Sequence, residues 1–139
     1  IFFSSSYIYP GKKGNYKEEE PLLPWNNYGW SKLGAESSVQ MYKNSLIIRA
    51  CMTEKPFVHK SAFTNVKTNF IFHHELAKLF VKLIKFKGII NLGGKQQSIY
   101  QFTKQNNISV KKIKSKGELP LKMDMNLKKY KRLIKNEDY

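Results

Sequence analysis

The sequence predicts an α/β fold built on a parallel sheet, and three stretches carry that prediction. Residues 1–9 are mostly apolar and contain three consecutive serines, which is typical of a strand with a polar end. Residues 28–43 contain no proline and have an imperfect helical spacing of apolar side chains, and residues 45–50 include the apolar run Leu46-Ile47-Ile48. A strand, a helix and a second strand in this order favour parallel pairing, because parallel strands need a crossover connection.

Turn and capping residues limit these three elements. Pro10-Gly11 predicts a turn after the first strand. Residues 12–24 contain two prolines and three consecutive glutamates, so we expect an exposed loop there. Asn26 or Asn27 is suited to cap the helix that follows.

The later residues predict shorter elements. Residues 52–69 lack clear periodicity and are expected to form a long loop, followed by a short strand over residues 69–72. The clearest amphipathic helix covers residues 74–85. Its inward face is expected to carry Leu76, Ala77, Leu79, Phe80, Leu83 and Ile84. The remaining expectations are a strand over 88–92, a short helix capped by Ser98 and ending near Gln105, an edge strand over 108–113 and a terminal helix over 125–134.

The net charge of +15 is unevenly distributed along the chain. Residues 1–50 contain six basic and four acidic side chains, whereas residues 51–139 contain nineteen basic and six acidic ones. This charge admits nucleic acid, an anionic surface or a phosphate-bearing substrate as partner. Only Arg49 and Arg132 are arginines, and base recognition favours arginine over lysine. We therefore interpret most lysines as solvated surface and expect no nucleic-acid partner.

Several features exclude other classes of protein. The single cysteine, Cys51, cannot form an internal disulfide or a CxxC metal site, so we expect a reducing, cytoplasmic environment and a buried thiol. Four lysines interrupt the apolar region over residues 76–92, so no membrane-spanning helix is expected. His73-His74-Glu75 lacks the HExxH spacing, and we interpret it as a capping or packing feature and predict no metal site.

Tyr28 and Lys32 are the residues best suited to chemistry. They are four residues apart, so on a helix they project from one face. A tyrosine is a poor proton donor or acceptor at neutral pH, and a nearby ammonium group makes it a better one by stabilising the phenolate. The hydroxyl of Ser5, at the end of the first strand, could position the reacting oxygen. By itself this spacing is weak evidence, because it occurs by chance in many helices.

The surrounding residues make the pattern specific. The serine strand precedes Tyr28 by 23 residues, counted from Ser5, and the helix reads Tyr28-Gly29-Trp30-Ser31-Lys32-Leu33-Gly34-Ala35-Glu36. This arrangement resembles the second half of an extended short-chain dehydrogenase/reductase, the superfamily of sugar-nucleotide epimerases, dehydratases and reductases. Residues 69–77 and 88–102 resemble the segments that follow in that superfamily. Within the superfamily, the motif from Tyr28 to Glu36 is most similar to that of dTDP-4-dehydrorhamnose reductases. Those reductases usually have Ser-Thr-Asp in place of the three serines.

The resemblance implies a fold and a set of site residues. We expect residues 1–50 to form the catalytic portion of a Rossmann-like NAD(P)-binding sheet and residues 51–139 a small substrate-binding subdomain, with the strand over 86–94 returning to the sheet. Residue by residue, the family implies that Ser5 orients the substrate, that Tyr28 is the general acid/base, and that Lys32 binds the cofactor ribose and stabilises the phenolate. The same resemblance places Ser4 and Ser6 beside these residues, and we assign Ser4 to the cofactor and Ser6 to the substrate. Lys60 and Lys67 belong to the long loop and could contact a diphosphate of the substrate, while solvated surface is the alternative interpretation of each.

One motif of the superfamily is absent from the sequence. The family binds NAD(P) through a glycine-rich turn after its first strand, and neither GxxGxxG nor GxGxxG occurs here. Gly93-Gly94 lacks the third glycine and predicts a turn. The chain also starts within an apolar run and without an initiator methionine, so we expect the sheet's first strands to precede Ile1.

The resemblance therefore predicts an NAD- or NADP-dependent enzyme that reduces a 4-keto nucleotide sugar, as in polysaccharide biosynthesis. A nucleotide sugar is the expected partner, and homo-oligomerisation stays open. The first alternative is a sugar-nucleotide 4-epimerase or dehydratase of the same superfamily. The second is a non-catalytic module in which the basic residues of 51–139 bind a polyanion.

Overall fold

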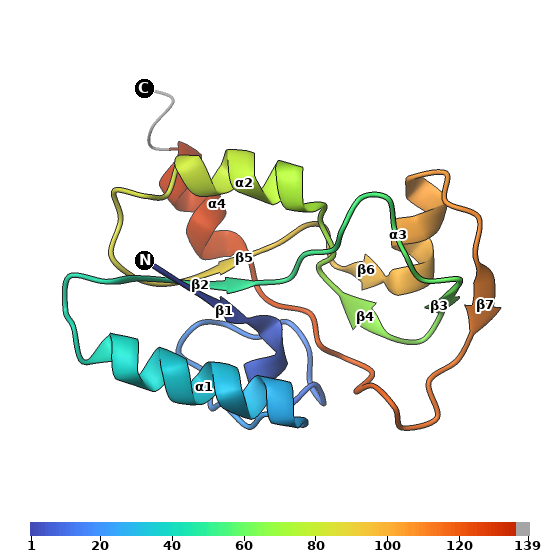
Figure 1. Ribbon diagram of the computed structural model, residues 1–139, viewed down its shortest axis with the longest axis horizontal. Helices are drawn as coiled ribbons and strands as arrows, with labels where there is room; N and C mark the ends of the chain where they lie inside the picture. The colour runs from blue at the N-terminus through green and yellow to red at the C-terminus, as the bar shows by residue number, and fades with distance from the viewer. Residues whose placement is uncertain (136–139) are drawn as a thin grey trace.

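The computed structural model describes residues 1–135. Three strands, β1 (Phe2–Ser5), β2 (Leu46–Ala50) and β5 (Gly88–Leu92), form a parallel sheet in the order β1-β2-β5 (Figure 1). The register aligns the last residues of the three strands, so their carboxyl ends lie at one edge. The predicted parallel α/β fold is confirmed.

Different helices cover the two faces of this sheet. α1 (Asn27–Gln40) covers the face that carries Arg49, since it supplies the glutamate that this arginine binds. α2 (His73–Val81) covers the opposite face, where the rings of Phe80 and Phe3 lie 5.0 Å apart. Neighbouring residues of a strand point to opposite faces, which explains how one short sheet holds both helices.

α4 (Lys128–Lys135) lies beside β5, where Nζ of Lys129 donates a hydrogen bond to the carbonyl oxygen of Ile89 at 2.6 Å. The main core fills the space between the sheet and its helices. Its fully buried apolar side chains include Ile8, Tyr9, Ile48, Leu83, Ile90, Leu92 and Met125. Removal of this apolar surface from water is the dominant favourable term in folding.

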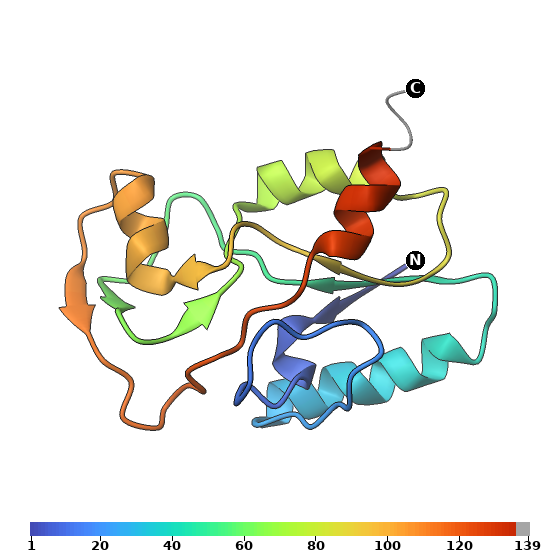
Figure 2. The same cartoon turned by 180° about the vertical axis from the view of Figure 1, so that it is seen from behind.

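A smaller lobe lies beyond the carboxyl ends of the three strands (Figures 1 and 2). It contains the parallel pair β3 (Ser61–Phe63) and β7 (Lys111–Ile113), the antiparallel pair β4 (Lys67–Thr68) and β6 (Gln97–Ser98), and helix α3 (Ile99–Gln105). Its separate core consists of the buried residues Ala62, Val66, Ile99 and Met123. β5, α2 and α4 follow residue 50 in the chain but pack with the main sheet, and the boundary expected at residue 50 stays a prediction.

Three predictions about connecting segments were wrong. Residues 52–69 are not a structureless loop, because they contain β3 and β4. Residues 69–72 form no strand and make only an isolated bridge between Thr53 and Phe72. The loop over residues 12–24 is not fully exposed, since Tyr16 is buried in the main core. In each case the segment contacts residues that are distant in sequence, so no local pattern of side chains predicts the contact.

The amphipathic helix predicted over residues 74–85 is shorter in the structure. α2 ends at Val81, and Leu83 is buried from the turn that follows. Ala77 and Ile84, which were expected to face inward, are exposed. None of the helices formed by residues 1–135 is long and apolar enough to span a membrane.

Two predicted helix caps are confirmed. Asn26 accepts a hydrogen bond from the backbone N–H of Gly29 at 2.8 Å and caps α1, and the Ser98 side chain caps α3. The last helix starts later than predicted, at Lys128, because Met125 is held by a hydrogen bond from its backbone N–H to the side chain of Asn69.

Candidate active site

The three serines lie where the parallel sheet ends. β1 stops at Ser5, and residues Ser6–Ile8 turn into a short 3₁₀ helix, so the first strand is shorter than the predicted 1–9. The side-chain oxygen of Ser5 accepts a hydrogen bond from the backbone N–H of Tyr7 at 3.1 Å. In open α/β sheets, ligands bind outside the carboxyl ends of the strands. The serines are therefore in the expected place for a binding site.

A cavity of about 290 Å³ opens at this edge. It is lined by Ser4, Ser5, Ser6, Tyr7, Tyr28, Ala50, Cys51, Met52, Phe70 and His73. The structure thus brings Ser5 and Tyr28, which are far apart in sequence, to one cavity, and Ser4 and Ser6 contribute to the same wall.

Lys32 is fixed beside Tyr28. Tyr28 lies in the first turn of α1 and is 51% exposed, with its ring edge-on to that of Tyr7 at 5.8 Å. One turn later, Nζ of Lys32 lies 5.9 Å from the centre of the Tyr28 ring and donates a hydrogen bond to the carbonyl oxygen of Phe3 at 2.9 Å. An ammonium group has three protons, so this bond anchors the charge and leaves protons for a ligand.

Gly29 brings the start of α1 close to the serine turn. A Cβ at this position would lie 2.5 Å from the carbonyl oxygen of Tyr7 and 2.9 Å from Cβ of Pro24. No other residue fits at this separation without a shift of the backbone. The absence of a side chain at Gly29 therefore allows α1 to approach the serine turn and helps to place Tyr28 at the cavity.

Two other ionisable groups in the cavity wall stay neutral at pH 7. Burial raises the pKa of Tyr7 to about 12 and that of the Cys51 thiol to about 11. A neutral thiol is a weak nucleophile, which agrees with the interpretation of Cys51 as a small buried residue. Tyr28 is the more exposed of the two tyrosines that line the cavity.

Ser4 supplies an observation that points to a ligand. Its hydroxyl is buried and has no hydrogen-bond partner within residues 1–135. Buried polar groups are nearly always paired, so this hydroxyl is available to a polar group that enters the cavity. Tyr28 lines the same cavity, whereas Lys32 lies beside the Tyr28 ring and is not among the residues that line it.

The other sequence-predicted residues lie elsewhere. Lys60 is exposed and lines neither this cavity nor the larger one described below. Lys67 lines that larger cavity, together with Gly93 and Gly94. Neither lysine lines the cavity beside Tyr28, and their assignment to the substrate stays a prediction. Glu75 accepts a hydrogen bond from the backbone N–H of Phe72 at 3.3 Å, as the capping interpretation expects.

Sequence reasoning missed several wall residues, among them Tyr7, Phe70 and His73. Tyr7 directly follows the serines, and the other two belong to the segment over 69–77 that resembles the superfamily. Adjacency to these motifs was the available signal, but it does not show which side chains turn toward the cavity.

Comparison with known proteins gives a consistent result. The family model described as the RmlD substrate binding domain matches residues 1–72. No curated protein matched the sequence. Among solved structures, a hypothetical dTDP-4-dehydrorhamnose reductase from Sulfolobus tokodaii has a TM-score of 0.76 and 26% identity, over 95% of this chain and 57% of that one.

Two further structures share the fold at lower identity. The dTDP-4-dehydrorhamnose reductase from Bacillus anthracis, in complex with NADP, has a TM-score of 0.73 and 16% identity, over 97% of this chain and 62% of that one. The UDP-glucuronic acid 4-epimerase from Bacillus cereus, in complex with NAD, has a TM-score of 0.70 and 19% identity, over 96% of this chain and 54% of that one. The chain thus spans between 54% and 62% of the length of these three proteins.

The sequence pattern, the parallel α/β architecture and the matched residues point the same way. The match covers more than half of the chain, from the serine strand through α1 and β2 to the wall of the cavity. The chain belongs to the RmlD substrate-binding domain family, within the short-chain dehydrogenase/reductase superfamily.

Proposed function

We propose that this chain carries the catalytic residues of an NAD(P)-dependent enzyme that reduces the 4-keto group of a nucleotide sugar. The observation that carries the proposal is the joint placement of Ser5 and Tyr28 on one cavity, with the Lys32 ammonium anchored beside Tyr28. Two structural neighbours support the cofactor class, since one was crystallised with NADP and another with NAD. Residues 1–50 supply these side chains, and residues 51–139 supply most of the substrate-binding portion.

Each residue has a distinct role in the proposed reaction. A bound nicotinamide supplies the hydride that reduces the ketone carbon. Tyr28 donates its hydroxyl proton to the carbonyl oxygen as negative charge develops there. Lys32 stabilises the resulting phenolate, because its ammonium is held near the ring by the carbonyl of Phe3. Ser5 accepts a hydrogen bond from the backbone of Tyr7, so its own proton remains available to hold the substrate oxygen.

The same residues are compatible with 4-epimerisation or dehydration. Two neighbours favour this alternative, namely the UDP-glucuronic acid 4-epimerase and a UDP-N-acetylglucosamine 4-epimerase from Methanobrevibacter ruminantium. A reductase consumes its reduced cofactor, whereas an epimerase or dehydratase regenerates it in each turnover. The absorbance of the nicotinamide during turnover with a 4-keto nucleotide sugar therefore separates the two.

The substitution Tyr28→Phe tests the roles of these residues. It removes the transferred proton and keeps the ring, so we expect the rate of NADPH or NADH oxidation to fall by about 100-fold or more. Tyr42→Phe is the matched control, because Tyr42 is also exposed and lies beyond the end of α1. Both variants are assayed in the isolated chain and in the chain joined to the portion of the Bacillus anthracis reductase that it does not cover.

Full activity of Tyr28→Phe would show that another group transfers the proton. An equal loss in Tyr28→Phe and Tyr42→Phe would point to a general effect on folding. The proposal requires a selective loss in the first variant, with NADP binding retained by both.

A further inference from the structure

A second cavity, of about 810 Å³, shares no lining residue with the one beside Tyr28. Phe70 and His73 line the smaller cavity, whereas Ile71 lines the larger one. The segment over residues 70–73 is therefore the wall between them. The larger cavity lies within the size range of small-molecule sites, which is roughly 300–1,000 Å³.

Its lining is strongly cationic. Among residues 1–135, Lys67, Lys95, Lys128 and Lys131 contribute to it, and no aspartate or glutamate of that range does. Within residues 1–135, the ammonium groups of Lys95, Lys128 and Lys131 make no hydrogen bond or ion pair. Four like charges around one concave space repel one another, and an anion placed among them would relieve that repulsion.

The carboxylate of Asp124, which contacts the lining residues Gln96 and Lys67, is already occupied. Asp124 is 2% exposed, and it accepts hydrogen bonds from the backbone N–H of Asn15 and from the side chain of Gln96, both at 2.9 Å. Its contact with Nζ of Lys67 is long, at 3.8 Å. Asp124 thus offsets one lysine at most, and the lining formed by residues 1–135 keeps a net positive charge.

The four lysines converge from separate parts of the chain. Lys67 lies on β4, Lys95 follows β5, and the other two lie on α4. Lys128 and Lys131 are three residues apart, so they project from the same face of that helix. The lining also includes apolar side chains and a tyrosine, namely Ile71, Leu79, Leu127 and Tyr130. The lining is therefore partly cationic and partly apolar.

Isolated surface lysines are usually only solvated, but these are gathered around a concave site that holds amide and aromatic groups as well. We propose that this cavity binds a small phosphate ester with an apolar or aromatic portion. Lysine is a compact point charge that suits phosphate oxygens, while the apolar lining side chains would receive the organic part. The wall at residues 70–73 makes this site separate from the proposed active site, and the inference does not depend on the proposed function.

Phenyl phosphate is a suitable probe, because it combines a phosphate with one aromatic ring. In a ¹H–¹⁵N NMR titration of the full chain at constant ionic strength, we expect it to shift the amide resonances of Gly93, Gly94 and residues 127–131. The amides of Ser4 to Tyr7 should not respond. Inorganic phosphate should bind more weakly because it lacks the ring, and benzyl alcohol should not bind because it lacks the charge.

A pair of double variants tests the role of the lysines. Lys95→Ala/Lys131→Ala should raise the Kd for phenyl phosphate by about tenfold or more, given the usual strength of hydrogen bonds to charged groups. Lys104→Ala/Lys111→Ala is the matched control, because both of its lysines are exposed and lie outside the cavity. It should leave the Kd unchanged. Lys95→Arg/Lys131→Arg keeps the charge and should retain binding, and the dispersion of the NMR spectrum shows that each variant is folded.

Three results would overturn the proposal. An unchanged Kd in Lys95→Ala/Lys131→Ala would show that these lysines do not form the site. An equal loss in both alanine double variants would indicate diffuse attraction to a basic surface, as in a polyanion-binding module. Shifts confined to Ser4–Tyr7 would place the phosphate ester in the cavity beside Tyr28.

Discussion

The tyrosines show how the environment of a residue decides what it can do. Tyr9 is fully buried, and burial raises its pKa to about 12 although Arg49 lies beside it. Tyr7 has a similarly raised pKa, whereas Tyr28 is half exposed beside an ammonium group. Of these three, only Tyr28 combines access to the cavity with a neighbouring positive charge. The residue type alone does not distinguish a proton donor from a structural phenol.

Because of Tyr9, the free energy of unfolding should decrease at alkaline pH. Its phenol is neutral in the folded chain up to about pH 12, but an unfolded chain ionises it near pH 10. The unfolded state therefore loses its proton first, and the free energy of unfolding should fall as pH rises from about 10 to 12, by roughly 2 kcal/mol. Below about pH 10 this contribution is fully present. Urea denaturation across this pH range measures it.

The variant Tyr9→Phe checks the assignment. It cannot ionise, so its stability should change less between about pH 10 and 12 than that of the parent. Both chains should carry Cys51→Ala, because the thiol has a raised pKa too and would add its own pH dependence. The same pH dependence in Tyr9→Phe and its parent would place the titration in another group.

At the scale of the helix, α1 contains two glycines that differ in the space available to a side chain. A Cβ at Gly29 would lie 2.5 Å from the carbonyl oxygen of Tyr7. Apart from Gly34's own neighbours in the helix, no atom of residues 1–135 lies within 4 Å of a Cβ at Gly34. We expect Gly29→Ala to lower the free energy of unfolding and to displace α1 from the cavity. Gly34→Ala should stabilise the chain by about 0.5–1 kcal/mol, the usual advantage of alanine in a helix interior. Thermal denaturation of both variants measures the difference, and equal effects would contradict the close approach at Gly29.

The cap of α1 offers a second comparison between neighbours. The sequence predicts either Asn26 or Asn27 as the N-cap. In the structure the cap is Asn26, whose side chain accepts a hydrogen bond from the backbone N–H of Gly29. Asn26→Ala should therefore lower the free energy of unfolding by about 1 kcal/mol. Asn27→Ala is the control, since Asn27 is exposed and is the first residue of the helix. A larger loss for Asn27→Ala would mean that the helix starts elsewhere.

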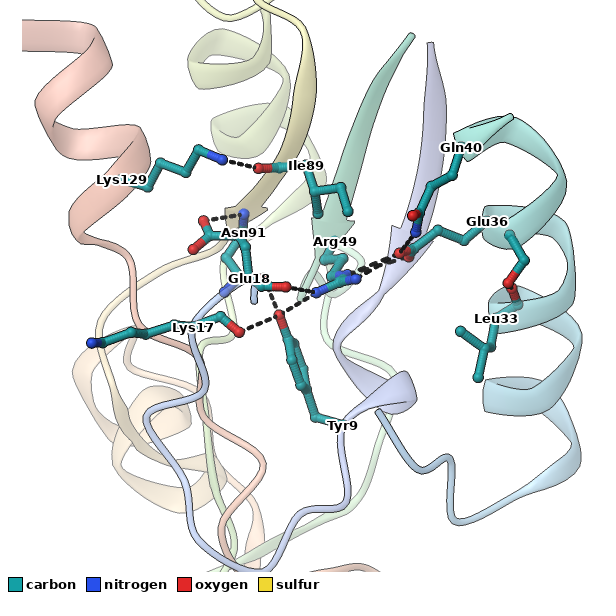
Figure 3. A network of polar contacts seen from close by, with 11 residues as sticks. Tyr9, Lys17, Glu18, Leu33, Glu36, Gln40, Arg49, Ile89, Asn91 and Lys129 are labelled. Atoms are coloured by element: carbon teal, nitrogen blue, oxygen red, sulfur yellow. Dashed lines mark hydrogen bonds and ion pairs between the residues drawn. The ribbon is translucent and has the colours of Figure 1, made fainter. Parts of the chain in front are cut away.

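At the scale of the whole molecule, one buried polar network joins distant parts of the chain (Figure 3). Arg49 of β2 forms an ion pair with Glu36 of α1 at 2.6 Å, and both side chains are almost fully buried. It also donates to the Tyr9 hydroxyl and to the carbonyl of Glu18, each at 2.8 Å. Tyr9 in turn donates to the side chain of Asn91 on β5 at 2.8 Å. The network therefore fixes α1, and with it Tyr28 and Lys32, relative to the sheet.

Breaking this ion pair should be costly. Glu36→Leu leaves a buried arginine without its partner, and we expect the free energy of unfolding to fall by about 3–5 kcal/mol. The double variant Glu36→Leu/Arg49→Met removes both charges and should recover part of that loss. As a control, Glu20→Gln removes an ion pair with the largely exposed Lys13 and should cost about 1 kcal/mol or less. Urea denaturation gives all three values, and a similar cost for the two single variants would contradict the role of the buried network.

The sequence by itself determined the features that depend on near neighbours. Asn26 and Ser98 cap helices within three residues, and the apolar runs of β2 and β5 are continuous in sequence, so their signals are local. The motif from Tyr28 to Glu36 is likewise local, and together with the serine strand it was enough to predict the fold class and the family, both of which are confirmed. The roles of Ser5, Tyr28 and Lys32 stay predictions, supported by the place of Ser5 and Tyr28 on one cavity and of Lys32 beside the Tyr28 ring.

Only the tertiary structure decided the contacts between distant segments. β7 lies within the strand predicted over 108–113, but β3, β4 and β6 have no periodic signal in the sequence, so the predicted loop over residues 52–69 was wrong. Long-range packing also buried Tyr16, turned Tyr7 and His73 toward the cavity beside Tyr28, and gathered four lysines around the larger cavity. The physical reason is that burial and charge clustering depend on which segments meet in space, whereas local patterns report only which segments form helices and strands.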